Sequence, residues 1–523
     1  MNEVLDKNFK TLYPRLETDI RNATFIAIDA EFTGIYSRED VKYSLFDTLA
    51  DRYKMLKKNI QQFIIAQFGI TVFRHNISEN TYTAQCFNFY LFPKSFPYKN
   101  RQFSCQVSAL EFLRKYGFEF DKVLNEGISY LDEIDEKSLR YLVQNDVIFN
   151  LEYLSHEEDI IFKDCISKIS EWLSSKSEQT TLKLQVDSPI LQYIVHKYIR
   201  NKYNNLWTLS DHMSINVMKK SNITCEQMES NLEEELLNSY IGFSKVFKLL
   251  SSSKKTIIGH NILLDLMFIH QQFYKPLPDS YDKFKSNMHI LFPHIYDTKF
   301  LSGELRNLFH KKEVNWKISS LSTLYEYFTS KGQTLSYNSP KIKINKELPH
   351  NKYHNAGWDA YIAGYIFIKM AHLFCIQKFG IGTEERGVTH SELINSIKGF
   401  ENSVHITKGN EMYMKLDGAD PISSRPEWLH ITSKSTSIDI KQLMNQFSSF
   451  GVVDIMPLAQ GRVLVAVGTH RSALHILQHF KNSKEFQVTR YSRIRHAKFT
   501  TICLWSGIIM FASIFTWTLR KCL

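Results

Sequence analysis

The sequence predicts an α/β protein of more than one domain, in which a mixed sheet flanked by helices forms the main core. Three observations support this: β-branched and aromatic segments cluster between residues 20 and 120, helical patterns dominate later, and the chain has 523 residues. One hydrophobic core seldom extends beyond about 250–300 residues, so two or three domains are expected. The hydrophobic content of 43% and the aromatic content of 13% argue against global disorder.

The first predicted strand ends in two acidic residues. Residues 24–28 form an apolar run, and Asp29 and Glu31 follow at its end. Residues two positions apart on a strand point to the same face, so both carboxylates would meet at the strand exit. Two neighbouring carboxylates repel each other and so do not stabilise the fold, but together they can bind a divalent cation.

Two further strands are predicted at residues 64–73 and 83–91, which are rich in β-branched and aromatic residues. Together with the first strand they would form an antiparallel meander. The following stretch, 121–240, is charged and helical in character, so we expect an inserted helical module that divides the core into residues 1–120 and 241–400. The core would resume with a buried strand at 256–258 and a helix that carries Asp265.

Within the predicted insertion, basic and aromatic residues alternate over residues 191–203. Such interleaving is typical of nucleic-acid surfaces. The alternative, which we favour slightly, is an amphipathic helix with Ile194, Tyr198 and Ile199 inward and the cations in solvent.

A third module is predicted at residues 426–492, after a helix that begins near Asp359 and ends near Phe374. Its segments follow the order βαββαβ, which is that of an RNA-recognition-motif (RRM) fold. Val463 and Val465 occupy the positions expected for the aromatic residues that stack on bases, so the RNA face of this module would be degenerate. The predicted segments are strand 427–432, helix 438–447, strand 451–455, strand 462–467, helix 470–480 and strand 486–489.

The last part of the chain predicts a membrane anchor. Residues 499–519 are a run of 21 residues without a charged side chain, long enough for a transmembrane helix. No secretory signal is visible at the N-terminus. We therefore expect a tail anchor with the catalytic part in the cytosol. The basic residues on both sides of the run favour the mitochondrial outer membrane over the endoplasmic reticulum.

The charge suits a nucleic-acid partner without requiring one, and the cysteine content fits a reducing compartment. The 64 Lys and Arg exceed the 54 Asp and Glu by 10, and this modest basic excess suits a polyanionic partner. The seven cysteines include no C-x-x-C pair, so a disulfide framework or a zinc finger is not expected.

Four acids and one histidine form the predicted catalytic set: Asp29, Glu31, Asp265, His354 and Asp359. In this order they resemble the DEDDh exonuclease superfamily, whose core is an RNase H-like mixed sheet. Hydrolysis of a phosphodiester by two Mg²⁺ ions, or Mn²⁺ in their place, needs several shared carboxylates. A neutral histidine can take the proton of the attacking water.

We assign a role to each member of this set. The first acid, Asp29, would bridge both metal ions, and Glu31 and Asp359 would hold the ion on the side of the nucleophile. The ion on the leaving-group side would be bound by Asp265. The general base would be His354, because Asn355 occupies the position that the tyrosine of the Y-x3-D branch would need.

Longer motifs resemble the poly(A)-specific ribonuclease family. The resemblance implies a 3′-to-5′ exoribonuclease that releases 5′-mononucleotides from single-stranded RNA, usually as a homodimer. One departure is the order of His196 and Arg200, which is the reverse of that in the family's small nucleic-acid-binding module. The matching segments are residues 27–35, 258–265, 272–278, 296–299 and 355–364.

The predicted tail anchor makes the chain similar to a branch of this family that trims precursors of PIWI-interacting RNAs. That likeness implies trimming at a mitochondrial surface, with a PIWI-type protein and a Tudor-domain scaffold as partners. The alternatives are a deadenylase of messenger RNA, an inactive nuclease fold that tethers RNA or PIWI proteins to a membrane, and a DNA exonuclease.

Four further residues are candidates for substrate binding. The first two, Phe32 and Ile35, could contact the terminal nucleotide or merely pack the strand exit. The other two, His260 and Asn261, could contact the terminal ribose or steady Asp265. For Asp297 we expect a structural role as the N-cap of a new helix.

Overall fold

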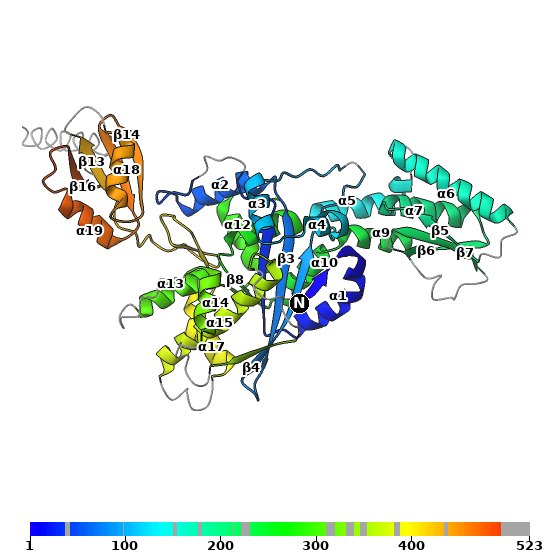
Figure 1. Cartoon of the computed structure of the whole chain (residues 1–523), viewed down its shortest axis with the longest axis horizontal. Helices are drawn as coiled ribbons and strands as arrows, with labels where there is room; N and C mark the ends of the chain where they lie inside the picture. The colour runs from blue at the N-terminus through cyan, green and yellow to red at the C-terminus, as the bar shows by residue number, and fades with distance from the viewer. Residues whose placement is uncertain are drawn as a thin grey trace, which may run out of the picture. The chain divides into compact units, whose positions relative to one another are not determined.

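The structure of the chain is a computed structural model (Figure 1). Its contacts divide it into two compact units. The first comprises residues 1–39, 55–405 and 415–419, and the second comprises residues 40–54, 406–414 and 420–523. The structure describes residues 1–36, 42–97, 99–149, 154–175, 180–211, 213–220, 231–309, 319–330, 339–345, 353–380, 388–433 and 438–492.

The first unit is built on a seven-stranded mixed sheet (Figure 1). Its strand order is β1-β4-β3-β2-β8-β9, and β10 also pairs with β4. The expected antiparallel meander is confirmed, because β3 pairs antiparallel with both β2 and β4. In contrast, β8 runs parallel to β2. The strands are β1 (Asn2–Val4), β2 (Phe25–Phe32), β3 (Ile65–Asn76), β4 (Thr81–Tyr90), β8 (Thr256–Gly259), β9 (Ile295–Asp297) and β10 (Lys341–Ile344).

Helix α15 (Ala356–Phe379) packs across one face of this sheet. On that face Phe367 contacts Phe25 with ring centroids 5.3 Å apart. On the opposite face Phe68 contacts Phe243 at 5.1 Å. The other helices of the unit are α1 (Asp6–Arg21), α2 (Leu49–Ile60, whose first residues belong to the second unit), α3 (Val107–Lys115), α4 (Phe120–Glu126), α10 (Ser244–Ser253), α11 (Leu263–Ile269), the π-helical turn His270–Tyr274, α12 (Tyr281–Leu291), α13 (Thr298–Phe309), α14 (Leu321–Thr329), α17 (His390–Ile397) and the 3₁₀ turn Lys398–Phe400. The unit also contains the short strand β11 (Ser403–His405) and the last residue of β12 (Tyr413–Lys415), whose first two residues belong to the second unit.

The start of α15 lies very close to β3. A Cβ atom added to Gly69 would lie 1.9 Å from the carbonyl oxygen of Ala356, so only glycine fits at this point of the strand. Asp29 is the register partner of Gly69 on β2. Because side chains alternate along a strand, the row that packs under α15 continues into Asp29 and Glu31 at the helix's N-terminal end.

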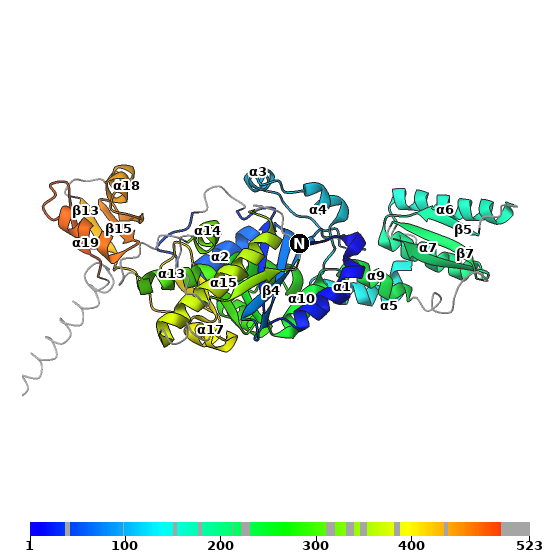
Figure 2. The same cartoon turned by 60° about the horizontal axis from the view of Figure 1, so that its bottom comes forward.

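Part of the chain inserted into the first unit is not helical, contrary to expectation. It contains a three-stranded antiparallel sheet of order β5-β7-β6 beside its helices (Figure 2). These strands alternate apolar and polar residues, and the polar ones give the segment its charged, helix-like composition. The elements are α5 (Glu133–Gln144), the 3₁₀ turn Val147–Phe149, α6 (His156–Ser174), β5 (Thr181–Gln185), α7 (Pro189–Lys202), β6 (Leu206–Asp211), β7 (Ser214–Lys219) and α9 (Leu232–Ile241).

Helix α7 is amphipathic, with Ile194 and Ile199 buried as expected. Its cations are not all in solvent, however. The guanidinium of Arg200 donates from Nη2 to the carbonyl oxygen of Thr208 at 2.7 Å and lies 3.8 Å above the ring of Trp207. His196 is also buried, and burial lowers its pKa to about 3. Both side chains of the reversed His196–Arg200 pair therefore make contacts within the inserted module.

The second unit contains the predicted βαββαβ module, and all six elements lie close to their expected positions. Its four strands form an antiparallel sheet of order β14-β15-β13-β16. The elements are β13 (Leu429–Ser433), α18 (Ile440–Ser448), β14 (Val453–Ala459), β15 (Arg462–Val467), α19 (His470–His479) and β16 (Phe486–Arg490).

One expectation about this module is wrong. Val463 and Val465 do not occupy the outward positions of β15, because both belong to the buried cluster between sheet and helices. Since side chains alternate along a strand, the outward residues are Arg462, Leu464 and Ala466. None of these three is aromatic, so the outward row of β15 still lacks stacking side chains.

The predicted anchor at residues 499–519 lies outside the described residues. Among the helices that the structure describes, α15 alone is long and apolar enough to cross a membrane, judged by length and composition. Of its most apolar stretch, 83% is buried within the protein. This is what is expected of the central helix of a folded core.

Candidate active site

The exit of β2 and the start of α15 bring the predicted catalytic residues together. Potential ligand atoms of Glu31, His354 and Asp359 all lie within 4.8 Å of one another. Asp29 precedes Glu31 by two residues on the same face of β2. The helix N-terminus favours negative charge at this place.

Asp265 reaches the same site from the neighbouring strand. It lies in the first turn of α11, which follows β8, and β8 is parallel to β2. The carboxyl ends of parallel neighbours meet at the same edge of the sheet. Asp265 and Asp359 are each among the factors that raise the pKa of Asp29 and of Glu31, so the four predicted acids are close enough to interact.

Asp265 and Asp359 are buried, and Asp29 and Glu31 are half-buried beside them, so the protonated forms of all four carboxyls are favoured in the metal-free protein. Burial is the main cause that raises the pKa of Asp29 and Glu31 well above their ordinary values, and the neighbouring carboxyls raise both further. Burial likewise raises the pKa of Asp265 to about 8, with Asp297 adding to the rise. The pKa of Asp359 rises to about 7 through burial, although the His354 N–H opposes this.

Two buried oxygen atoms in this cluster lack a hydrogen-bond partner within the described part of the chain. They are Oδ1 of Asp265 and Oδ1 of Asp359. Orphaned buried carboxylate oxygens are rare in folded proteins, and they are suitable ligands for Mg²⁺ or Mn²⁺. A divalent cation would satisfy them and offset the repulsion among the four acids, so the donor set fits such an ion.

His354 lies in a short turn just before α15. Its backbone has φ = 61°, in the left-handed region that histidine adopts uncommonly. The backbone N–H of His354 donates to Oδ2 of Asp359 at 2.9 Å. This bond holds the turn next to Asp359, which is a predicted metal ligand. Burial lowers the pKa of the imidazole, so the ring is neutral at pH 7 and able to accept a proton.

Two aromatic residues that sequence reasoning missed flank this histidine. The rings of Phe112 and Tyr116 lie 4.5 and 4.2 Å from the imidazole, measured between centroids. Both residues are more than a third exposed. Their spacing of four residues on α3 marks them as one helix face, but nothing in the sequence connects that face to a histidine over 200 residues later.

Strand side chains hold the N-terminus of α15 against the sheet. Oε1 of Gln67 accepts from the Ala356 N–H at 2.8 Å, and Oδ1 of Asn88 accepts from the Gly357 N–H at 3.0 Å. Both amide side chains are buried. These bonds give hydrogen-bond acceptors to N–H groups of the first turn of α15, which have no acceptor within the helix. They also hold this turn, which carries Asp359, against the sheet.

Asp297 organises the turn that leads to Asp265. Its carboxylate accepts from the backbone N–H groups of Asn261 at 2.8 Å, Lys299 at 2.9 Å and His405 at 2.9 Å. The bond from Lys299 is the expected capping contact at the start of α13, so the structural role is confirmed.

The four predicted substrate-binding residues differ in their surroundings, and their roles stay predictions. The ring of Phe32 stacks on Phe268 at 4.2 Å, which agrees with packing of the strand exit. Ile35 is half-buried beside the predicted acids. Nδ1 of His260 lies 2.9 Å from Oγ1 of Thr298, so this histidine supports the turn. Asn261 is exposed in a left-handed turn with φ = 60°.

The raised pKa values of Asp265 and Asp359 predict a pH-dependent stability of the metal-free protein. The folded state binds more protons than the unfolded state between about pH 4 and pH 8, so stability is present at low pH and is lost as pH rises through about 7–8. In EDTA we expect the melting temperature to fall by roughly 5 °C from pH 5.5 to 8. Thermal unfolding by circular dichroism measures this.

With saturating Mg²⁺ the melting temperature should no longer fall between pH 5.5 and 8, because the bound ion keeps the carboxylates ionised. The variant Asp265→Asn should show a smaller fall in EDTA than the wild type. A melting temperature that rises with pH in EDTA would contradict the cluster of raised pKa values.

Known proteins are similar in sequence to this chain over nearly its whole length. A family model described as CAF1 family ribonuclease matches residues 4–367. The Bombyx mori pre-piRNA 3′-exonuclease trimmer is 33% identical, over 99% of this chain and 98% of that protein. The poly(A)-specific ribonuclease PNLDC1 of Mus musculus is 29% identical, over 95% of both chains. The poly(A)-specific ribonuclease PARN of Xenopus laevis is 27% identical, over 94% of this chain and 80% of that protein.

Proposed function

The chain belongs to the CAF1 family of ribonucleases and is a 3′-to-5′ exoribonuclease, and we propose that it works by two-metal DEDDh chemistry on PIWI-bound small-RNA precursors. The observation that supports the chemistry best is the convergence of four buried or half-buried carboxyls and a neutral histidine at one edge of the sheet. A binding module would gain nothing from this repulsive arrangement.

Each residue of the set has a defined task in this mechanism. The ligands of the ions are Asp29, Glu31, Asp265 and Asp359. When bound, Mg²⁺ or Mn²⁺ supplies charge neutralisation on the phosphate and a more acidic attacking water. The neutral imidazole of His354 accepts the proton of that water, and the rings on α3 restrict its orientation. Hydrolysis at the last phosphodiester releases a 5′-mononucleotide.

The proposed substrate follows from the relatives. The protein named as a pre-piRNA trimmer is 33% identical and matches along 98% of its own length, whereas the PARN relative is 27% identical and matches along 80%. This difference favours trimming of PIWI-bound precursors over deadenylation of messenger RNA. A PIWI-type protein and a Tudor-domain scaffold are the partners that we propose.

We propose further that the chain is tail-anchored through residues 499–519, with its catalytic unit in the cytosol. The support is the uncharged run of 21 residues with basic residues on both sides. A mitochondrial outer membrane is the proposed location, and a homodimer the proposed assembly. The βαββαβ module is proposed to be of the RRM type, with a degenerate RNA face.

The test compares two RNAs with detergent-solubilised wild-type protein, each in Mg²⁺ and in EDTA. One RNA is a free strand with a 3′-oligo(A) end, and the other is a PIWI-bound precursor extended at its 3′ end. Product lengths are resolved on denaturing gels. We expect Mg²⁺-dependent trimming of the bound precursor and weak action on free oligo(A).

Rapid removal of free oligo(A) would favour the deadenylase. Turnover of neither RNA would favour the inactive tether. Equal trimming in EDTA would contradict the metal-dependent mechanism.

A further inference from the structure

The second unit includes a segment from far outside the βαββαβ module. Residues 40–54 belong to it by their contacts, although they follow β2 in the sequence. We call the described part from Ser44 to Arg52 the strap. Its turn Ser44–Asp47 contacts one end of the outward face of the four-stranded sheet.

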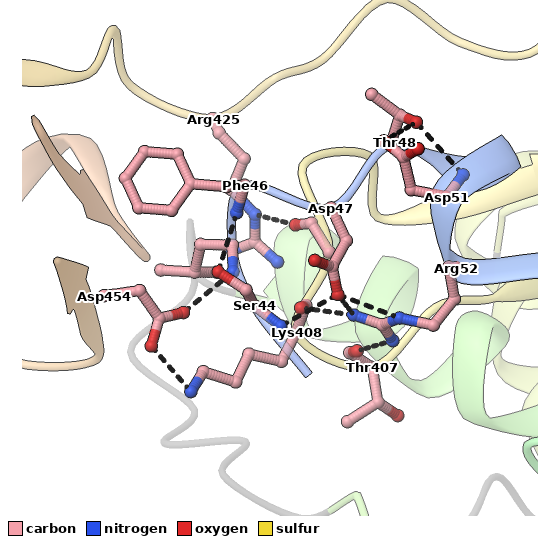
Figure 3. Close-up of polar contacts among 12 residues, drawn as sticks. Ser44, Phe46, Asp47, Thr48, Asp51, Arg52, Thr407, Lys408, Arg425 and Asp454 are labelled. Atoms are coloured by element: carbon pink, nitrogen blue, oxygen red, sulfur yellow. Dashed lines mark hydrogen bonds and ion pairs between the residues drawn. The ribbon is translucent and has the colours of Figure 1, made fainter. Parts of the chain in front are cut away.

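At one end of that face the strap binds Asp454 of β14. The carboxylate accepts from the Leu45 N–H at 2.7 Å and pairs with the Lys408 ammonium at 2.8 Å (Figure 3). Asp454 is the register partner of Ala466 on β15, so it faces outward beside that residue. Leu45 is only 2% exposed, so its side chain is buried.

In the same cross-strand row, on the far side of β15, the strap contacts an aromatic pair. The ring of Phe46 packs edge-on against Trp428 at 5.1 Å, and Trp428 lies 6.1 Å from Tyr491. Trp428 precedes His430 by two residues, so both lie on the outward row of β13. The strap thus spans the sheet from β14 to the beginning of β13.

The strap is itself held rigidly by a buried arginine. Arg52 is 3% exposed, and it donates to Oδ2 of Asp47 at 2.8 Å and to the carbonyl oxygens of Thr407 and Lys408 at 2.7 and 2.8 Å (Figure 3). Its guanidinium also lies 3.9 Å from the ring centre of Tyr43. A buried cation with this many partners is costly to disturb.

The covered face lacks what RNA recognition by this kind of sheet requires. RRM sheets stack bases on exposed aromatic side chains of the two central strands. Here the outward residues of the central strands are buried: His430 is 7%, Leu464 3% and Ala466 2% exposed. The outward carboxylate of Asp454 also disfavours a phosphate backbone.

We propose that the outward sheet face of the βαββαβ module is a peptide-binding surface whose occupant is the chain's own strap, and that it does not take single-stranded RNA. The surface selects a tight turn, such as that of Ser44–Asp47, with two adjacent apolar side chains and a backbone N–H that donates to Asp454. This inference does not depend on the catalytic proposal.

Hydrogen–deuterium exchange of the full chain, measured on peptides, tests the proposal. In Asp454→Ala and in Phe46→Ala we expect amides 44–47 to exchange at least tenfold faster, while peptides of α15 and β3 stay unchanged. The matched control is Glu427→Ala, an exposed acid of the same module that lies 4.0 Å from Arg490. Unchanged exchange of the strap in both variants would overturn the proposal.

A second arm uses the wild-type chain and needs no variant. A single-stranded RNA of about 30 nucleotides is added in EDTA until its fluorescence anisotropy saturates. We expect no change in exchange at residues 44–47, 428–432 or 462–467. Faster exchange of the strap together with protection of both strands would mean that RNA displaces it, and would overturn the proposal.

Discussion

Glu31→Gln removes exoribonuclease activity and leaves the fold intact. Glutamine replaces one anionic metal ligand by a neutral amide of the same shape, and the loss of charge stabilisation in the transition state lowers turnover by about three orders of magnitude or more. The single-turnover rate of 3′-end shortening in Mg²⁺ measures this loss.

The same substitution should not destabilise the metal-free protein. Burial and two neighbouring acids, Asp359 and Asp265, raise the pKa of Glu31 well above its ordinary value, which favours the protonated form without metal. Glutamine mimics that neutral form. In EDTA we therefore expect a melting temperature equal to or above that of the wild type. The increase in melting temperature on adding Mg²⁺ should be smaller in the variant than in the wild type.

A suitable control is Glu79→Gln, because Glu79 is exposed and pairs with Lys343 at the surface. It should change neither turnover nor the Mg²⁺ effect, since surface ion pairs contribute little. Retention of wild-type turnover in Glu31→Gln would exclude the assigned metal site.

The convergence of the four acids at one sheet edge could be predicted because its signals are local. The Asp29–Glu31 pair follows an apolar strand, and side-chain alternation alone places both acids on one face. The helix positions of Asp265 and Asp359 follow from motifs of a few residues. The six segments of the βαββαβ module were also located, because each combines a clear period with a flanking turn signal.

The errors have physical causes. Strands β5, β6 and β7 bury only one face, so their polar alternate residues gave the insertion a helical appearance. Val463 and Val465 were assigned to the wrong face because an alternation pattern does not say which face is outward when both are apolar. In β15 the residues on both faces are buried, Val463 and Val465 on one face and Leu464 and Ala466 on the other.

Other features depend on contacts between distant segments and have no local signal. The aromatic pair Phe112 and Tyr116 contacts His354 only because α3 and the turn before α15 converge in the fold. The strap has the composition of an ordinary connection after β2. Its role depends on Asp454, about 400 residues later.

His354→Asn tests the general base with little disturbance of the backbone. Asparagine tolerates the left-handed conformation at φ = 61° better than alanine does, and it keeps the backbone N–H that donates to Asp359. It cannot accept a proton from water. We expect turnover to fall by about 10²–10⁴-fold, the usual contribution of a general base.

The Mg²⁺-induced rise in melting temperature distinguishes a base from a metal ligand. Because potential ligand atoms of Glu31, His354 and Asp359 lie within 4.8 Å of one another, the histidine is near enough to bind an ion directly. For a general base, His354→Asn should retain the Mg²⁺ effect while losing turnover, and His294→Asn, at a half-exposed histidine paired with Glu401, should alter neither. Loss of the Mg²⁺ effect along with turnover would instead assign His354 to the metal, and the proton of the attacking water would then need another acceptor.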